Sequence, residues 1–192
     1  MVCKSKLKQD ETVMGTNRTK LLVTTGLFTA LTAAGAFIKI PFYPVPFTLQ
    51  SFFTGFAGVV LPPYWAFLSQ MLYLLLGLLG LPIFAQGGGL GYVLQPTFGY
   101  LLMLPLSAFL ISFHIHFAKH KTLILSFLII VAGLVIILIG GTLGLTFHFR
   151  FIMPAPIKIT TILKSGVLLF LPAAILKSFV SVSYTHLRAH ET

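Results

Sequence analysis

Hydrophobic residues run along the chain in long stretches that are separated by short polar or Pro- and Gly-rich segments. A bilayer core roughly 30 Å thick is crossed by about 20 apolar residues in a helix, because every backbone group must be paired inside the segment. Six stretches qualify, so the pattern predicts an all-α integral membrane protein, a bundle of six transmembrane helices. The predicted helices are residues 20–38, 47–61, 64–80, 97–117, 122–145 and 165–182.

These helices form one predicted membrane domain over residues 20–182, and the basic segment 1–19 precedes it. The first apolar stretch is too long for the core of a signal peptide and leads into Pro-rich sequence, so we expect it to be retained as a helix. Residues 183–192 break abruptly from the hydrophobic run and read like translated adapter DNA joined to a truncated reading frame. We therefore expect an artefactual tail and a shortened last helix.

Two connections differ from ordinary polar loops. Residues 39–50 are rich in Pro and residues 80–97 are rich in Gly, and both segments are apolar and aromatic. Non-helical backbone of this hydrophobicity is tolerated at membrane depth only where it is buried in protein or lines a cavity. The sequence therefore predicts re-entrant-like loops that cap a pocket. The alternative is a pair of interfacial aromatic belts and turns.

Charge excludes whole classes of mechanism. The chain has 13 Lys and Arg against three acids, Asp10, Glu11 and Glu191, so no carboxylate side chain lies between Thr12 and His190. Paired-carboxylate hydrolysis, carboxylate-held Mg²⁺ and proton relays through intramembrane acids all need groups that are missing. No Gly-rich loop ends in Gly-Lys-Ser/Thr, so the chain binds no ATP through a P-loop. Uphill transport would take its energy from a partner.

The positive-inside rule gives the expected orientation in the cell membrane. With six helices, seven cations fall on one side and four on the other, which places both termini in the cytoplasm. The first side has Lys4, Lys6, Lys8, Arg18, Lys20, Lys119 and Lys121, and the second has Lys39, Arg150, Lys158 and Lys164.

Polar side chains in or beside the two capping loops are neutral. They comprise Thr48, Gln50, Gln86, Gln95, Thr97 and several Tyr residues. Amides and hydroxyls pair with urea-like N–H and C=O groups without burying further charge, so this set suits a neutral polar heterocycle in an apolar pocket. For any single residue, a role in loop structure is the alternative.

Lys177 lies in an otherwise apolar stretch that has no carboxylate to pair with it. An anionic ligand would supply the missing partner; alternatively, the side chain extends to the cytoplasmic headgroups. The histidines His114, His116 and His120 lack carboxylate or thiolate companions, and we expect an interfacial polar cap rather than a metal site. We expect no cofactor.

Gly26, Ala30 and Ala34 recur at four-residue intervals on one face of the first predicted helix. Small residues let a second helix approach closely in lipid. The stripe therefore fits either another membrane subunit or the protein's own helices.

Three segments closely resemble the BioY family, whose members are the biotin-binding S components of energy-coupling factor (ECF) transporters. They are residues 44–50 (PVPFTLQ), 73–89 (YLLLGLLGLPIFAQGGG) and 95–100 (QPTFGY), and the resemblance extends over residues 20–182. It implies six helices, an outward-facing biotin pocket capped by the first and third outer loops, and no enzymatic activity. It also implies that the small stripe faces the transmembrane coupling subunit, and that ATP hydrolysis takes place on separate cytoplasmic subunits.

The resemblance also implies the site. Gln50 and Gln86, with nearby Tyr and Thr residues, would orient the polar ring, Tyr73 and Phe84 would cover apolar parts, and Lys177 would face the carboxylate. The full set of implied substrate-binding residues is Thr48, Gln50, Tyr73, Phe84, Gln86, Gly88, Tyr92, Gln95, Thr97, Tyr100 and Lys177.

One motif departs from the family pattern. The family's last motif reads Pro-Phe-x-Pro-Gly-Asp-x-x-Lys, and this chain keeps Lys177 but has Ala173 and Ala174 in place of Gly and Asp. Without the Asp, we expect a freer Lys and a more electropositive pocket. Competing hypotheses are an S component for another vitamin or a biotin precursor, a lipid-modifying membrane enzyme that uses the His cluster, and a scaffold without a ligand.

Overall fold

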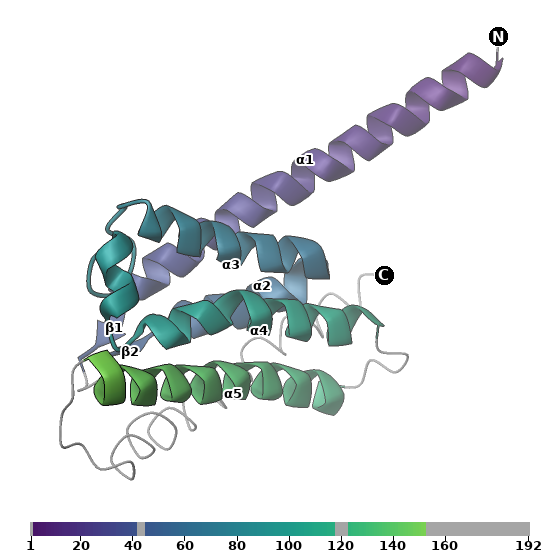
Figure 1. The fold of residues 1–192 in the computed structure, drawn as a ribbon. Helices are drawn as coiled ribbons and strands as arrows, with labels where there is room; N and C mark the ends of the chain where they lie inside the picture. Colours follow the sequence, from purple (N-terminus) through teal and green to yellow (C-terminus); the bar gives the residue numbers. More distant parts are fainter. Residues whose placement is uncertain (1, 42–44, 118–122, 153–192) are drawn as a thin grey trace.

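The computed structural model describes residues 2–41, 45–117 and 123–152, which are mostly helical (Figure 1). The helices are α1 (Val2–Phe37), α2 (Gln50–Val60), α3 (Pro63–Leu78), α4 (Phe98–Phe117) and α5 (Leu123–Phe147). A 3-10 helix, η1 (Leu90–Leu94), lies between α3 and α4, and a π-helical segment, η2 (His148–Ile152), follows α5. Two short strands, β1 (Lys39–Ile40) and β2 (Phe47–Thr48), connect α1 to α2.

The helical prediction is confirmed for the described part of the chain, whereas the strand pair was not expected. Three helical segments are long and apolar enough to cross a membrane: Asn17–Phe37, Phe98–Phe117 and Ile124–Ile152. Two others are shorter than a full span, since α3 has 16 residues and α2 has 11. The predicted sixth helix lies outside the described residues, so the count of six stays a prediction.

The strand pair forms because the chain must reverse direction directly after α1. Lys39 pairs with Thr48 and Ile40 with Phe47 in antiparallel register. The Leu49 N–H then donates to the carbonyl of Gly35 over 3.1 Å, which brings the start of α2 back onto the last turns of α1. A Cβ atom on Gly35 would lie 2.8 Å from the Phe53 ring, so this close return requires glycine.

Prolines and glycines set the ends of α2 and α3. Pro62 and Pro63 cannot continue a helix interior, and Pro63 instead occupies the first turn of α3, where no backbone donor is lost. The chain leaves α3 through Gly80, whose φ of +111° is accessible to glycine without strain. The predicted third helix therefore ends two residues early, at Leu78.

A buried polar cluster links α1, α2 and α3. The Gln70 side chain accepts a hydrogen bond from Thr54 over 3.0 Å and donates to Thr32 and Ser69 over 3.2 Å each. Thr29 donates to the carbonyl of Ser69 over 2.8 Å. Because buried amides and hydroxyls are costly when unpaired, these bonds fix which faces of the three helices meet.

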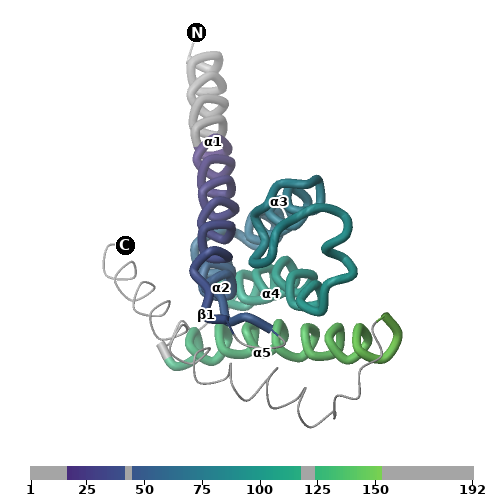
Figure 2. The backbone as a smooth tube through the Cα atoms, turned by 90° about the vertical axis from the view of Figure 1, so that its left-hand side faces the viewer, coloured from purple at the N-terminus to yellow at the C-terminus, as the bar shows by residue number. Residues whose placement is uncertain are grey.

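Helix α4 packs against α2, α3 and α5. Its contact with α5 is close, because a Cβ atom on Gly144 would lie 2.7 Å from the Cα of Gly99. Helix α1 runs at a steep angle to α5 (Figures 1 and 2). The strand pair, η1, the start of α4 and the end of α5 meet at one end of the helices, which we call the pocket end.

Candidate functional site

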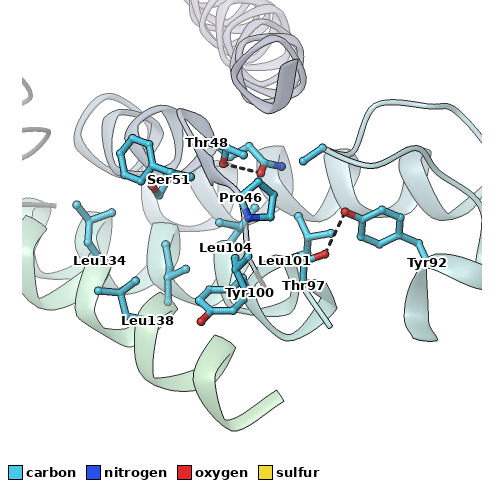
Figure 3. Close-up of a pocket in the computed structure, with 15 residues that line it drawn as sticks. Pro46, Thr48, Ser51, Tyr92, Thr97, Tyr100, Leu101, Leu104, Leu134 and Leu138 are labelled. Atoms are coloured by element: carbon cyan, nitrogen blue, oxygen red, sulfur yellow. Dashed lines mark hydrogen bonds between the residues drawn. The ribbon is translucent and has the colours of Figure 1, made fainter. Parts of the chain in front are cut away.

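A pocket lies at the pocket end, between the strand pair, the loop after α3, and helices α4 and α5 (Figure 3). The space between its side chains is about 690 Å³, including the part that is open to the surroundings. The lining residues are Val45, Pro46, Phe47, Thr48, Gln50, Ser51, Ala85, Tyr92, Thr97, Tyr100, Leu101, Leu104, Leu134, Ile137 and Leu138.

One polar edge of the pocket is built where β2 meets α2. The Thr48 hydroxyl donates to Gln50 Oε1 over 2.8 Å, and Gln50 Nε2 donates to the Tyr73 hydroxyl. The Tyr73 hydroxyl in turn donates to the carbonyl of Ile83 over 3.1 Å. Because Gln50 is buried, these bonds hold its amide in one orientation at the pocket wall.

A second polar edge comes from the loop before α4. The Thr97 hydroxyl donates to the Tyr92 hydroxyl over 3.1 Å (Figure 3). Burial raises the pKa of the Tyr92 hydroxyl, so this group is neutral at physiological pH and can both donate and accept. The pocket therefore has neutral hydrogen-bonding groups on two sides.

The floor between these edges is apolar. Helix α4 contributes Leu101 and Leu104, and α5 contributes Leu134, Ile137 and Leu138. Sequence reasoning missed these residues, because nothing distinguishes a pocket-facing leucine from a lipid-facing one in a uniformly apolar helix. Combined with the polar edges, the floor suits a ligand with a polar ring and aliphatic parts.

Phe84 and Tyr73 lie behind the wall rather than in it. The two rings meet edge to face with centroids 5.4 Å apart, and the Phe84 and Tyr92 centroids are 4.6 Å apart. Phe84 occupies the space of a missing side chain, since a Cβ atom on Gly77 would lie 2.1 Å from its ring. These aromatic residues support the loop that carries Ala85 and Tyr92 into the pocket.

The expected substrate-binding residues that the structure describes lie in three places relative to the pocket: in its wall, behind the wall and on the exposed loop. In the wall lie Thr48, Gln50, Tyr92, Thr97 and Tyr100, and behind it lie Tyr73 and Phe84. Gln86, Gly88 and Gln95 are exposed on the loop and are not part of the lining. Lys177, with Ala173 and Ala174, lies outside the described residues.

The basic side chains named in the orientation argument that the structure describes lie in two regions. Arg18 and Lys20 lie near the middle of α1, at the start of its apolar segment Asn17–Phe37, whereas Lys39 and Arg150 are at the pocket end. The Lys39 ammonium donates to the carbonyl of Ala85 and so joins β1 to the loop after α3.

Two of the three clustered histidines are described. His114 and His116 lie in the last turn of α4, far from the pocket, and bond to groups of their own helix. Within the described ranges, no group of three potential metal ligands comes together.

The small stripe on α1 points away from the rest of the described protein. Gly26, Ala30 and Ala34 are all exposed, and a Cβ atom on Gly26 would meet nothing within 4 Å. Among the described helices none covers this face.

The model of the BioY family matches residues 6–191. A probable biotin transporter BioY of Lysinibacillus sphaericus is 52% identical over 53% of this chain, and the match spans 52% of that relative, about half its length. The biotin transporter BioY of Thermotoga maritima is 42% identical over 70% of this chain and 79% of its own.

A solved structure has the same overall fold. It is a crystal structure of the S component for biotin from an ECF-type ABC transporter, with a TM-score of 0.79 and 26% sequence identity. The similarity covers 92% of this chain and 94% of that chain.

Proposed function

The chain belongs to the BioY family, and from this membership we propose that it is the substrate-binding S component of an ECF-type transporter with biotin as its ligand. The observation that carries the proposal is the pocket with an apolar floor between two neutral polar edges. Relatives on both the sequence and the structure side are named for biotin transport. The relatives are named as transporters, and transport is not an enzymatic function.

The chemical groups of biotin match the polar edges and the apolar floor of the pocket. Its ureido ring offers N–H donors and a carbonyl acceptor, which the amide of Gln50 and the hydroxyls of Tyr92 and Thr97 can pair without burying a charge. Its aliphatic chain and thioether fit the leucine-rich floor of α4 and α5. We assign the contact with the ligand carboxylate to Lys177, as the family resemblance implies.

We further propose that the pocket end faces outward. The clustered cations of the N-terminal segment are at the opposite end of α1, and short segments rich in Lys and Arg stay in the cytoplasm. Biotin would then be captured from outside. Energy for its release inward would come from ATPase subunits that act through a membrane coupling subunit, because the chain has no P-loop.

The exposed stripe of Gly26, Ala30 and Ala34 is the proposed docking face for that coupling subunit. Small side chains allow two helix backbones to approach closely in lipid. An Ala30→Trp substitution should abolish co-purification with the coupling subunit while leaving biotin binding unchanged. The matched control is Leu143→Trp, an exposed position of α5. Retained co-purification of the Ala30 variant would contradict this assignment.

Equilibrium binding of labelled biotin to the purified full chain in lipid nanodiscs tests the function. We expect saturable binding that unlabelled biotin displaces, and no ATP requirement. Dethiobiotin, riboflavin and thiamine serve as competitors. Saturable binding of one of these compounds without binding of biotin would assign the chain to another substrate, and no binding of any compound would favour a scaffold.

A further inference from the structure

The loop after α3 presents large apolar side chains on its outer surface. Leu79 is 81% exposed, Leu90 77% and Leu94 60%. No charged residue occurs between Leu79 and Gln95. Exposed apolar groups gathered on one surface mark contact with lipid or with another protein.

Helix α3 is too short to cross a bilayer. Its 16 residues span about 24 Å at 1.5 Å per residue, roughly 6 Å less than the hydrocarbon core. Leu72, Leu75 and Leu79 are exposed at helical spacing, so the apolar outer face of α3 continues past its last helical residue. This exposed face reaches the pocket end, where the loop begins, so the loop is placed to supply the missing length.

The loop is folded back against that end of α3. The Gly89 N–H donates to the carbonyl of Gly77 over 2.7 Å, which places Leu90 directly beside the last turn of the helix. Leu90 therefore lies beside the end of α3, and Leu94 follows it at the other end of η1.

The backbone of the loop is largely paired within the protein. Phe84 and Gly87 exchange hydrogen bonds of 2.9 and 3.2 Å, and the Tyr92 N–H donates to the carbonyl of Gly89 over 3.0 Å. The Gln95 N–H donates to the carbonyl of Tyr92 over 3.0 Å. Unpaired backbone groups are costly in hydrocarbon, and these bonds lower that cost where the loop meets the lipid.

We propose that Leu79, Leu90 and Leu94 insert into the acyl-chain region of the leaflet at the pocket end. They complete the span that α3 leaves short. The same loop carries Ala85 and Tyr92 to the pocket wall on its inner side, so the cover of the pocket is anchored in lipid. The exposed amide of Gln86, on the same loop, marks the part that stays at the headgroups or in water.

Quenching of tryptophan fluorescence by brominated lipids tests the proposal. The chain has a single tryptophan, Trp65, near the start of α3, and Trp65→Phe removes its signal. Leu90→Trp and Leu94→Trp are then made singly in that background, with Gln86→Trp as the matched control. The full chain is reconstituted in phosphatidylcholine vesicles with bromines placed either near the ester ends or near the tips of the acyl chains.

We expect blue-shifted emission from the Leu90 and Leu94 variants, with greater loss of emission for bromines near the ester ends. The Gln86 variant should emit as in water and lose little emission with either lipid. Emission from Leu90→Trp and Leu94→Trp that is blue-shifted but unquenched would show that protein covers the loop instead of lipid. Unshifted emission would place it in water, and either result overturns the proposal. The readout involves no ligand, so a failure of biotin binding would leave this inference standing.

Discussion

Gln50 joins the strand pair, α2 and α3 through its amide. It is buried at the pocket wall, accepts from Thr48 and donates to Tyr73. The sequence singled it out as one of the neutral polar groups in or beside the capping loops. The partners themselves could not be predicted, since Tyr73 lies 23 positions away and approaches only after α3 has packed.

Replacing Gln50 with leucine should raise the Kd for biotin roughly tenfold, because one buried hydrogen bond to the ligand, worth about 1 to 2 kcal/mol, is lost. Gln86→Leu is the control, because Gln86 is exposed and outside the pocket lining. Isothermal titration of both variants gives the comparison. An equal loss of biotin affinity in the two variants would contradict a specific role of Gln50 in the pocket wall.

Lys39 connects the two capping segments. Its ammonium donates to the carbonyl of Ala85, a residue of the pocket wall. Lys39→Met keeps most of the apolar stem but removes the donor, at a cost of about 1 kcal/mol for the half-exposed bond. We expect amide hydrogen exchange across residues 81–89 to quicken a few fold. Arg150→Met, another exposed cation at the same end, should leave that exchange unchanged. If residues 81–89 exchange their amide hydrogens at the same rate in the Lys39 variant, the bond from Lys39 to Ala85 does not hold this loop.

The sequence indicated the polar residues of the pocket wall but not the apolar ones. Thr48, Gln50, Tyr92, Thr97 and Tyr100 were expected to bind substrate; they lie in the wall, and their contact with a ligand stays a prediction. The apolar floor was not predicted, because which leucines face the pocket depends on how α4 and α5 rotate against each other. Gln86 and Gln95 share the chemistry of Gln50, but the loop turns them outward.

Long apolar stretches predicted the elements well where the hydrophobic run is uninterrupted. The bounds of α4 differ by one residue from the expected 97–117, and α1 and α5 contain most of their predicted ranges. The strand pair was missed because two-residue strands leave no alternation to detect. The predicted helix 47–61 is shorter, because β2 occupies its first residues and Pro62 follows its end.

Close packing of α4 on α5 shapes the pocket through one glycine. A Cβ atom on Gly141 would lie 2.1 Å from the Tyr100 ring, and Tyr100 is part of the wall. Gly141→Ala should therefore displace the ring or separate the helices, which costs about 1 to 3 kcal/mol. Both a lower thermal midpoint and a higher Kd for biotin are expected.

The control for this variant is Gly26→Ala, because nothing lies within 4 Å of the added methyl group. It should leave the Kd unchanged and should not lower the midpoint, because alanine favours a helix interior over glycine. Normal stability and normal affinity of Gly141→Ala would mean that the contact between α4 and α5 is looser than the structure indicates.

On the scale of the whole molecule, the pocket and the stripe of small residues lie on two different surfaces. One end holds a pocket with neutral polar edges, and the outer face of α1 holds an exposed stripe of small residues. Hydropathy predicted a membrane bundle, and charge predicted dependence on a partner for energy. The steep angle of α1 to α5 (Figure 2) could not be predicted, because it depends on how α2, α3 and α4 pack between these two helices, and no periodic pattern in the sequence gives that packing.

Biotin binding by two neighbouring variants of α5 tests whether this pocket holds the ligand. Leu138 lines the pocket, whereas the next residue, Ile139, is 53% exposed on the outer face. Equilibrium binding of labelled biotin to the nanodisc-embedded protein is measured for Leu138→Trp and Ile139→Trp beside the unmodified chain. We expect the indole at position 138 to fill the pocket and abolish binding, while the variant at position 139 binds as the unmodified chain does. Undiminished binding by the Leu138 variant would show that biotin is held elsewhere.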